Sequence, residues 1–598
     1  MKSSRKKIVA AVTSLVLAGA MLTGCSTAAS STAAADTAAA TAYVDGAQTA
    51  ESVLAANTAV HTADAAYDAS TAVGIALTGS SATVDGDGVT VDGGTVTITA
   101  AGTYRISGTL TDGQIVVAAD GATVTLVLAG ATVSSSSTAA IAVTAAERVV
   151  VILADGTTST LSDTSGYAAD ADVNAALFSA ADLTVAGDGA LVVHGNGNDG
   201  IASKDGLLIT AGTITVEAAD DGIRGKDYLS VTGGAITVTA GGDGLKADND
   251  TDADAGFVVV GGGTVTVTAG GDGVDAVTDV VVTGGTVTVA AGGGHGAAAG
   301  DDTSMKGVKS GVVTVLAGGT IAADASDDAV HSDGSVHLSG ATVTLAAGDD
   351  AVHAENALVV DGGAVEVSTS GEGLEAADIT VAAGSVHVVS TDDGLNASGG
   401  TSTGGGGGPG GEMAAGDFSV TVTGGTLVVD ANGDGLDSNG TATISGGTVV
   451  VNGPAGQGNG ALDVNGTLTV TGGVLVAAGS SGMAVAPSAD SAQGWVSVTF
   501  DSTIAAGTTL QLADADGTVI ATFTTSKELQ NLVFSAADIT SGEEYTVYRG
   551  GSASGGSTGG LAGAGELGSA TRIATATAGE APAGGFGPGG GNRGGQRG

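Results

Sequence analysis

One short phrase recurs along the middle of this chain at a nearly constant spacing. Each copy has an acid, a small residue and an apolar residue in succession, as in DDGIRGKD around Asp221. Most successive copies begin 21 or 22 residues apart. A fixed period of this size predicts a repeat architecture, because each repeat can bury its apolar face only against its neighbours. The anchor positions of the phrase are Asp199, Asp221, Asp243, Asp272, Lys306, Asp328, Asp350, Glu372, Asp393 and Asp434.

Each period also contains two runs of alternating apolar and polar residues, separated by Gly-Gly. In DGIRGKD, YLSVTGG, AITVTAGG the alternation of Ile236 and Val238 indicates strands with one buried face. Pairs such as Gly233-Gly234 are expected to supply positive-φ corners. Three strands per repeat, in register, predict an all-β fold, a right-handed parallel β-helix. One expected interior ladder is Ile201, Ile223, Leu245, Val274, Val308, Val330, Val352, Leu374, Leu395 and Leu436.

The N-terminus has the features of a secretory signal. Four basic residues precede an apolar run from Ile8 to Leu22, which is too short to span a bilayer comfortably. The run ends in Leu22-Thr23-Gly24-Cys25, which matches a bacterial lipobox in which Cys25 is lipidated. Cys25 is the single cysteine, so no intramolecular disulfide can form. We expect a lipid anchor on the extracellular face of the cell membrane; the alternative is an ordinary signal peptide with an incidental cysteine.

Composition divides the rest of the chain. An Ala/Ser/Thr-rich stretch precedes the first alternation near residue 82, the period stops after residue 483, and the C-terminus is Gly-rich. The expected units are a lipoprotein signal peptide at 1–24, a tether at 25–80, the parallel β-helix at 81–486, a C-terminal β capping module at 487–549 and a disordered tail at 550–598.

Net charge limits the partners of the folded part. The chain has 17 basic and 63 acidic side chains, a formal charge of −46. Loss of the signal removes four basic residues and no acids, which leaves 13 basic side chains and a charge of −50. Nucleic acid and anionic lipid are therefore poor partners. We expect a monomer that contacts the membrane only through its N-terminal lipid.

The acids stack at one corner of successive coils. Adjacent strands lie about 4.8 Å apart, so neighbouring carboxylates repel by roughly 1 kcal/mol even in water. Such a ladder needs counter-charges or protons. Short side chains with hard oxygen ligands favour Ca²⁺, whereas the alternative is a solvated acidic face that keeps the protein soluble. The candidate calcium ligands are Asp199, Asp220, Asp221, Asp243, Asp248, Asp250, Asp327, Asp328, Asp349, Asp350, Asp392 and Asp393.

The residue three places after each anchor forms a second row that is expected to face outward. This row mixes charged and hydrogen-bonding side chains, which suits a polar groove for a hydroxylated or carboxylated polymer. For any single member, an exposed side chain that balances its acidic neighbours is the simpler interpretation. The candidate ligand-binding residues, most of them in this row, are Lys226, Lys246, Lys309, His331, His353 and Glu375.

Several motifs together resemble a known family. NDGIASKD, DDGIRGKD, SDDAVHSDGSV, GDDAVHAENAL, GEGLEAADITV and STDDGLNASGG resemble, in order and spacing, the bacterial cell-surface carbohydrate-binding proteins with a calcium-containing parallel β-helix. That family is similar to the pectate-lyase β-helices and is associated with acidic pectin-type and cellulosic polysaccharides. The resemblance covers roughly residues 82–550 and implies calcium held by the paired aspartates and a binding role. The chain departs from the pattern at Lys306 and Glu372, which occupy anchor positions.

Two classes of function follow. The first is calcium-dependent, non-catalytic binding of polysaccharide, either the acidic pectin type such as polygalacturonate or cellulosic; the second is a calcium-dependent pectate lyase. A lyase needs a base beside calcium, but Lys204 and Lys226 occupy equivalent positions in successive coils, which indicates repetition. We therefore expect no enzyme. Aromatics make up only 3% of the chain, so a flat stacking platform is hard to build. Surface adhesion through Thr-x-Thr rows is weaker still, because the threonines do not persist.

Overall fold

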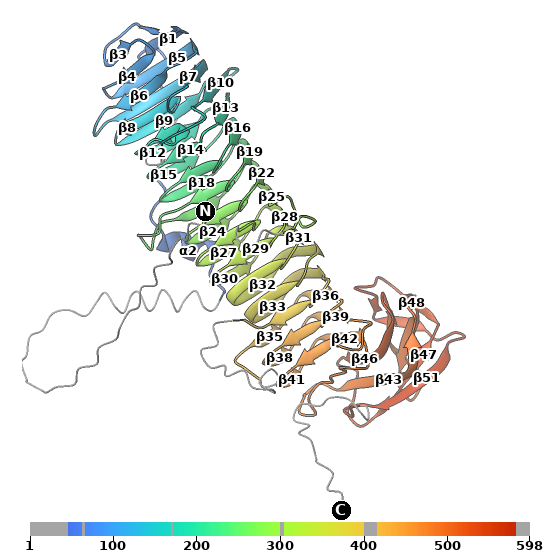
Figure 1. Ribbon diagram of the computed structural model, residues 1–598. Helices are drawn as coiled ribbons and strands as arrows, with labels where there is room; N and C mark the ends of the chain where they lie inside the picture. Colours follow the sequence, from blue (N-terminus) through green and yellow to red (C-terminus); the bar gives the residue numbers. More distant parts are fainter. Residues whose placement is uncertain (1–45, 63–65, 169–170, 299–303, 400–414, 582–598) are drawn as a thin grey trace, which may run out of the picture. The chain divides into compact units, whose positions relative to one another are not determined.

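The repeats wind into a parallel β-helix. The computed structural model describes residues 46–62, 66–168, 171–298, 304–399 and 415–581. Each regular coil contributes three short strands, and equivalent strands of successive coils pair in parallel (Figure 1). One coil, for example, consists of β17 (Ile223–Gly225), β18 (Tyr228–Val231) and β19 (Ala235–Ala240). The predicted all-β solenoid is confirmed.

The strands form three faces. The anchor face carries the strand that follows each anchor residue, and the second and third faces carry the next two strands of each coil. Two long strands, β32 (Val352–Thr369) and β33 (Leu374–Val389), run through all three faces. The other anchor-face strands are β4 (Thr95–Ile98), β6 (Gln114–Ala118), β8 (Ile141–Ala145), β11 (Ala175–Ser179), β14 (Asp199–Ser203), β17, β20 (Leu245–Ala247), β23 (Val274–Ala276), β26 (Val308–Ser310), β29 (Val330–Ser332), β34 (Leu395–Ala397), β37 (Leu436–Ser438) and β40 (Leu462–Val464).

The other two faces repeat in the same way. The second face contains β9 (Arg148–Leu153), β12 (Asp182–Ala186), β15 (Gly206–Ile209), β18, β21 (Phe257–Val260), β24 (Asp279–Val282), β27 (Val313–Leu316), β30 (Ser335–Leu338), β35 (Ser419–Val422), β38 (Thr441–Ile444) and β41 (Leu468–Val470). The third face contains β10 (Thr158–Ser162), β13 (Ala190–Gly195), β16 (Thr213–Ala218), β19, β22 (Thr264–Ala269), β25 (Thr286–Ala291), β28 (Thr320–Ala325), β31 (Thr342–Ala347), β36 (Thr426–Asp430), β39 (Thr448–Asn452) and β42 (Val474–Gly479). At the N-terminal end, β1 (Val73–Gly79), β5 (Gly102–Leu110) and β7 (Thr123–Ser134) run through both the second and the third face.

The interior consists of stacked like residues. The ladder that begins at Ile201 runs in unbroken register to Leu436, and each of its members is at most 2% exposed. Because each side chain packs on its equivalents one coil above and below, the repeat period fixes where every anchor and row residue lies.

The Gly-Gly corners differ in one respect from the sequence prediction. Only the second glycine of each pair has a positive φ, for example 94° at Gly234 and 82° at Gly263. The first glycine is required for another reason: a Cβ at Gly233 would lie 2.3 Å from the carbonyl oxygen of Thr210 in the previous coil. The pair therefore combines one conformational requirement with one close backbone approach.

The N-terminal part of the solenoid begins earlier than residue 81. β1 already pairs in parallel with β5, and β2 (Ala82–Val84) and β3 (Val89–Asp92) add antiparallel pairs at this end. Part of the expected tether is also ordered, because α2 (Ala50–Ala56) packs its buried Val53 with Tyr228, Phe257 and neighbouring valines of the second face. The signal segment and Cys25 lie outside the described residues.

The C-terminal module pairs with the last coil. β46 (Leu529–Ser535) runs antiparallel to β42 and to β43 (Trp495–Ile504), so the edge of β42 is covered. The module extends beyond residue 549, since strands continue to residue 577. Its remaining strands are β44 (Thr509–Ala513), β45 (Val519–Thr524), β47 (Glu544–Arg549), β48 (Ser552–Ser554), β49 (Leu561–Ala562), β50 (Ala564–Glu566) and β51 (Thr571–Thr577). Among the described residues, no helix has the length and apolarity needed to cross a membrane.

Candidate ligand-binding and metal-binding face

The predicted outward row is a single line of paired residues on the anchor face. Strand pairing joins its members coil by coil without a register shift at the row position. In most of these strands the flanking residues are buried and the row residue is partly exposed, whereas in β34 the row residue Asn396 is buried as well. In order, the row is Arg224, Lys246, Asp275, Lys309, His331, His353, Glu375, Asn396, Asp437 and Asp463.

In the first coils of the row, basic side chains neutralise the anchor acids. Arg224 Nη2 lies 2.7 Å from Asp199 Oδ2, and its Nη1 lies 3.2 Å from Asp248 Oδ2. Lys246 Nζ lies 2.6 Å from Asp243 Oδ2. Burial raises the pKa of Asp199 to about 6 despite Arg224. The counter-charge that the acid ladder requires is therefore built into the chain in these coils.

Ion pairs between lysines and acids continue along the next coils of the row. Lys246 Nζ lies 3.3 Å from Asp221 Oδ2, so this one lysine bridges two anchor acids. Lys309 Nζ lies 3.1 Å from Asp272 Oδ2 and 3.3 Å from Asp275 Oδ1. We call the corners from Asp199 to Asp328 the cation-paired corners.

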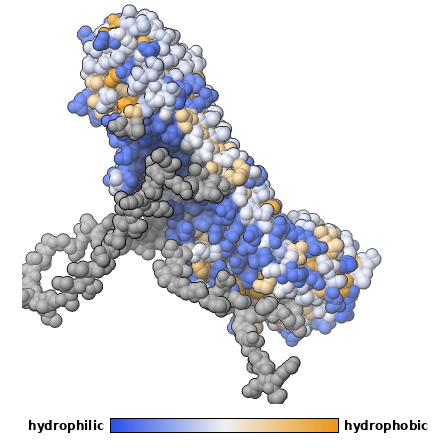
Figure 2. All heavy atoms as spheres, in the orientation of Figure 1, coloured by the Kyte–Doolittle hydropathy of each residue, from blue (hydrophilic) through white to orange (hydrophobic). Residues whose placement is uncertain are grey.

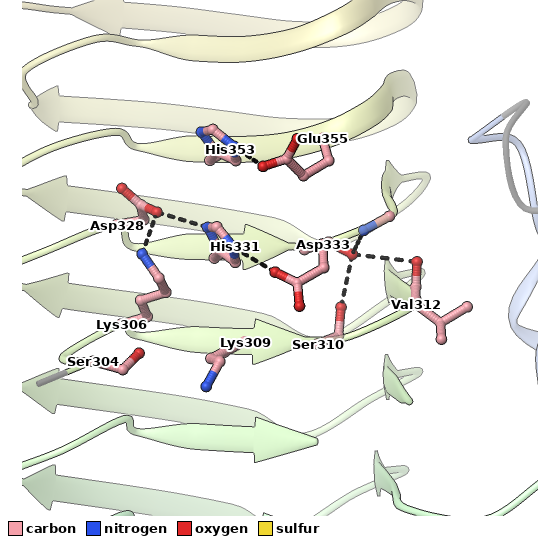
Figure 3. A network of polar contacts seen from close by, with 12 residues as sticks. Ser304, Lys306, Lys309, Ser310, Val312, Asp328, His331, Asp333, His353 and Glu355 are labelled. Carbon is pink, nitrogen blue, oxygen red and sulfur yellow. Dashed lines mark hydrogen bonds and ion pairs between the residues drawn. The ribbon is translucent and has the colours of Figure 1, made fainter. Parts of the chain in front are cut away.

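The next coils bring together histidines and acids (Figure 3). Asp328 Oδ2 accepts hydrogen bonds from Lys306 Nζ at 2.6 Å and lies 2.8 Å from His331 Nδ1. Burial would raise the pKa of Asp328, yet His331 and Lys306 lower it to about 2. One coil on, His353 Nδ1 lies 3.0 Å from Asp350 Oδ2 and 2.9 Å from Glu375 Oε2. Burial would lower the pKa of His353, but these two carboxyls raise it to about 11.

Beyond Glu375 the character of the face changes. Within the described residues, no ion pair involves the acids on the anchor face of these coils, although Asp430 on the third face pairs with His387. A Cβ at Gly433 would lie 2.4 Å from Oδ1 of both Asp392 and Asp393, so the glycine leaves a cradle that both carboxylates border. Asn396 is 9% exposed, donates Nδ2 to Glu372 Oε2 at 2.8 Å, and has a buried Oδ1 with no hydrogen-bond partner. We call this set the carboxylate corner: Glu372, Asp392, Asp393, Asn396, Asp434, Asp437 and Asp463.

Burial and mutual repulsion destabilise the charged form of the acids in the carboxylate corner. Burial, together with repulsion from neighbouring acids, raises the pKa of Asp393 to about 6, of Asp434 to about 7 and of Asp437 to about 8. Two of these acids accept backbone bonds, from Asp434 N to Asp393 Oδ1 and from Gly460 N to Asp434 Oδ1, each at 2.5 Å. Fixed, partly dehydrated carboxylates without counter-charge have the donor chemistry of a hard-cation site.

Other predicted site residues are placed less centrally. Asp220, Asp250 and Asp349 are exposed. Asp327 joins Lys306, with Oδ2 at 3.0 Å from Nζ. Lys226 lies two residues beyond the row, at the turn into β18, and no ion pair among the described residues includes it. The calcium and saccharide roles assigned to all these residues stay predictions.

Sequence reasoning left several members of the carboxylate corner out of its ligand set. Asp463 was missed because Gly460 stands where its anchor acid would be, although the Leu-Asp dipeptide of GDGLDSN recurs in GALDVN. Asn396 was expected in the outward row but not among the metal ligands, because the pairing of its amide nitrogen with Glu372, which leaves the amide oxygen without a partner, is visible only in three dimensions.

The surface around the row is polar. On the face that Figure 2 draws, hydrophilic residues cover much of the middle coils, and most apolar areas lie toward the two ends. Among the described residues, Val277 is the one large apolar side chain that is exposed, at 38%. Such a surface favours a hydroxylated or charged ligand over an apolar one.

Comparison with known proteins gives this polar face a context. A family model described as carbohydrate-binding domain-containing protein matches residues 92–351 and 332–409. The chain belongs to this family. The matched residues of this carbohydrate-binding protein include most of the row, from Arg224 to Asn396. No curated protein matches the chain.

Among solved structures, the chain is similar to one titled as the polysaccharide lyase-like protein from C. thermocellum, gadolinium derivative. The two sequences are 36% identical, and the match covers 37% of this chain and 92% of that chain, with a TM-score of 0.37.

Proposed function

We propose that this carbohydrate-binding protein binds acidic, pectin-type polysaccharide at the cell surface without catalysis, and that Ca²⁺ at the carboxylate corner mediates the binding. The observation that carries the proposal is the change along the row from cation-paired corners to acids without counter-charge. An anionic polymer approaching this part of the face meets uncompensated negative charge, so it needs a bridging cation.

The residues of the carboxylate corner fit calcium. Ca²⁺ takes six to eight oxygen ligands from carboxylates, amides, backbone carbonyls and water. Asp392, Asp393, Asp434 and Asp437 supply carboxylates, and the bare Oδ1 of Asn396 supplies a buried amide oxygen. When bound, the ion would neutralise carboxylates of the protein and of a uronate together. The cation-paired corners fit less well, because lysine, arginine or histidine already occupies the space beside each acid.

The protonation of the lysines favours a binding function over lyase activity. A general base must be unprotonated near neutral pH. Burial alone would lower the pKa of Lys306 and Lys309, but the adjoining aspartates raise both above their ordinary value. Hydrogen bonding with Asp243 and the other nearby acids likewise outweighs burial and raises the pKa of Lys246. These lysines serve as counter-ions to the protein's own acids.

The test measures binding of purified protein to de-esterified polygalacturonate with calcium and with excess chelator. We expect binding only with calcium, and weaker binding to the methyl-esterified polymer. Asp393→Asn with Asp434→Asn should lower affinity at least about tenfold, roughly 1.4 kcal/mol. The matched control, Asp501→Asn with Asp538→Asn, removes the same charge from exposed positions of the C-terminal module and should bind as wild type.

Three results would contradict the proposal. Binding that survives chelation would remove the role of calcium. Preference for the esterified polymer would remove the role of charge. Release of unsaturated uronate products by wild-type protein would show lyase activity instead.

A further inference from the structure

Two adjacent coils place a pair of histidines inside the acidic row, and nothing equivalent occurs elsewhere in it. The rings of His331 and His353 stack with centroids 4.9 Å apart and planes 13° apart. Figure 3 shows them one above the other, on neighbouring strands β29 and β32, beside the anchor acid Asp328. The row position holds lysine in the coil before and glutamate in the coil after.

In both histidines, Nδ1 faces the carboxylates of the anchor face. Asp328, His331 and His353 each offer one ligand atom to a set whose atoms lie within 4.8 Å of one another, and Asp350, His353 and Glu375 form another such set. Ligand atoms bound to one tetrahedral ion at about 2.0–2.1 Å lie roughly 3.3 Å apart. Within the two sets, the hydrogen-bonded nitrogen and oxygen atoms lie 2.8 to 3.0 Å apart and all pairs lie within 4.8 Å, a range that includes that value.

The second nitrogen of each ring faces a further carboxylate. His331 Nε2 lies 3.1 Å from Asp333 Oδ1, and His353 Nε2 lies 3.7 Å from Glu355 Oε1. Histidines that bind metal usually donate their other N–H to a carboxylate or carbonyl, which fixes the tautomer and orients the ring. Both outer acids stand two residues after their histidine, in HSD and HAE, so both coils repeat the same arrangement.

The inner ligands are rigidly held but reachable. The side chains of Asp328 and Asp350 are 5% and 8% exposed, whereas those of His331, His353 and Glu375 are 13%, 20% and 17% exposed. An ion can therefore enter from solvent into a site whose ligands are already positioned by the β ladder.

We propose that His331 and His353, with Asp328, Asp350 and Glu375, offer two overlapping ligand sets that share His353 and together bind one divalent transition metal ion of the zinc type, separate from calcium. Imidazole nitrogen favours such ions, whereas calcium takes oxygen ligands. The site begins at Asp328, the last of the cation-paired corners, and precedes the carboxylate corner. Lys306 Nζ lies 2.6 Å from Asp328 Oδ2, so an ion that takes this oxygen displaces the lysine from it. The anchor face would thus have two kinds of cation site, and the row residue decides between them: histidine for a zinc-type ion, asparagine or aspartate for calcium.

The test is a calorimetric titration in which Zn²⁺ is added to the full-length protein. The buffer contains calcium in the millimolar range, so that sites with only oxygen ligands are already occupied. We expect one zinc per chain. His353→Gln or His331→Gln should weaken zinc binding by more than about a hundredfold, and Asp333→Asn, which removes only an outer partner, by about ten- to a hundredfold. His387→Gln is the matched control, because His387 also lies between two acids, Glu366 and Asp430, but has no partner histidine.

Co²⁺ provides a second readout that a merely structural histidine would not affect. Its visible absorption reports ligand type and geometry, and we expect a spectrum that changes in His331→Gln and stays unchanged in His387→Gln. Thermal unfolding of each variant without metal shows which variants fold, and Glu375→Gln replaces any that does not. Zinc binding that persists in the double histidine variant, that excess calcium abolishes, or that fails to occur in wild type would overturn the proposal.

Discussion

Single residues decide how the acid ladder is neutralised. One row position, three residues after each anchor, holds arginine, lysine, histidine, asparagine or an acid, while the strand around it keeps the same geometry. Where the row residue is basic, it lies 2.6 to 3.3 Å from acids of its own or a neighbouring coil. Where it is Asn396 or Asp437, no counter-charge is supplied. A substitution at this one position therefore changes the electrostatics of a coil without changing its fold.

A second residue-scale effect concerns Asp279 on the second face. This carboxylate is 2% exposed, and its Oδ2 accepts a hydrogen bond from Asn57 Nδ2 at 2.8 Å. Burial raises its pKa from 3.8 to about 6. Above pH 6 the folded state holds a buried charge, which costs stability; as pH falls from 6 toward 4 the folded state takes up a proton and this cost disappears.

We therefore expect Asp279→Asn to stabilise the protein at pH 7.5, by at most about 3 kcal/mol. The difference from wild type should shrink as pH falls through 6 and vanish near pH 4. Thermal unfolding of both proteins across this range measures the effect. Asp501→Asn, at an exposed position, is the control and should track wild type. Equal stability of Asp279→Asn and wild type at pH 7.5 would refute the assignment of a buried charge.

At the scale of elements, the segment 46–62 lies along the second face of the solenoid and contacts several coils. His337 Nδ1 lies 2.8 Å from the carbonyl oxygen of Gln48, α2 packs at Phe257 and Val313, and Arg148 donates to the carbonyl oxygen of Thr62. α2 begins after its N-cap Thr49, whose hydroxyl accepts a hydrogen bond from Ser52 N. These contacts shield an apolar stripe that the valines of the second face would otherwise expose.

Val53→Asp should release this segment without unfolding the β-helix. A charge placed among Tyr228, Phe257 and valines costs several kcal/mol unless it reaches water. Limited proteolysis should then cut within residues 46–62 in the variant, while far-ultraviolet circular dichroism stays that of wild type. Ala55→Asp introduces the same charge on the exposed side of α2 and should remain protected at those residues. Equal protease resistance of Val53→Asp and wild type would show that the segment does not depend on this contact.

At the scale of the whole molecule, charge compensation is unequal along the solenoid. Arg224 pairs with acids of its own and neighbouring coils, whereas burial and neighbouring acids raise the pKa of Asp437 to about 8. Because each coil contacts only its neighbours, a solenoid can lose stability locally. Calcium should therefore stabilise one part of the molecule more than another.

Hydrogen exchange with calcium and with excess chelator tests this difference. Chelation should lower protection in β34, β37 and β40, and leave β17, β20 and β23 unchanged. At calcium a hundredfold above Kd, the expected stabilisation is about 2.7 kcal/mol, which is roughly a hundredfold in local opening. Equal loss of protection in both sets of strands, or none, would argue against calcium at the carboxylate corner.

The sequence by itself determined the fold, because a 22-residue period with Gly-Gly corners and alternating strands leaves few packings other than a parallel β-helix. It also determined the register, and hence the interior ladder from Ile201 and the outward row from Arg224. Because every coil has the same geometry, the position of a residue within its repeat predicts the face and the ladder on which it lies.

Only the tertiary structure decided which acids have counter-charges. Arg224 spans from Asp199 in one coil to Asp248 in another, and Lys246 bridges Asp221 and Asp243; such pairs depend on the reach and direction of long side chains across stacked coils. The packing of Val53 on the second face was equally invisible, since α2 is too short to stand out in an Ala-rich stretch and is stabilised by contacts more than 170 residues away in sequence. Local pattern fixes a repeating backbone, whereas long-range contacts between unlike residues exist only once the coils are stacked.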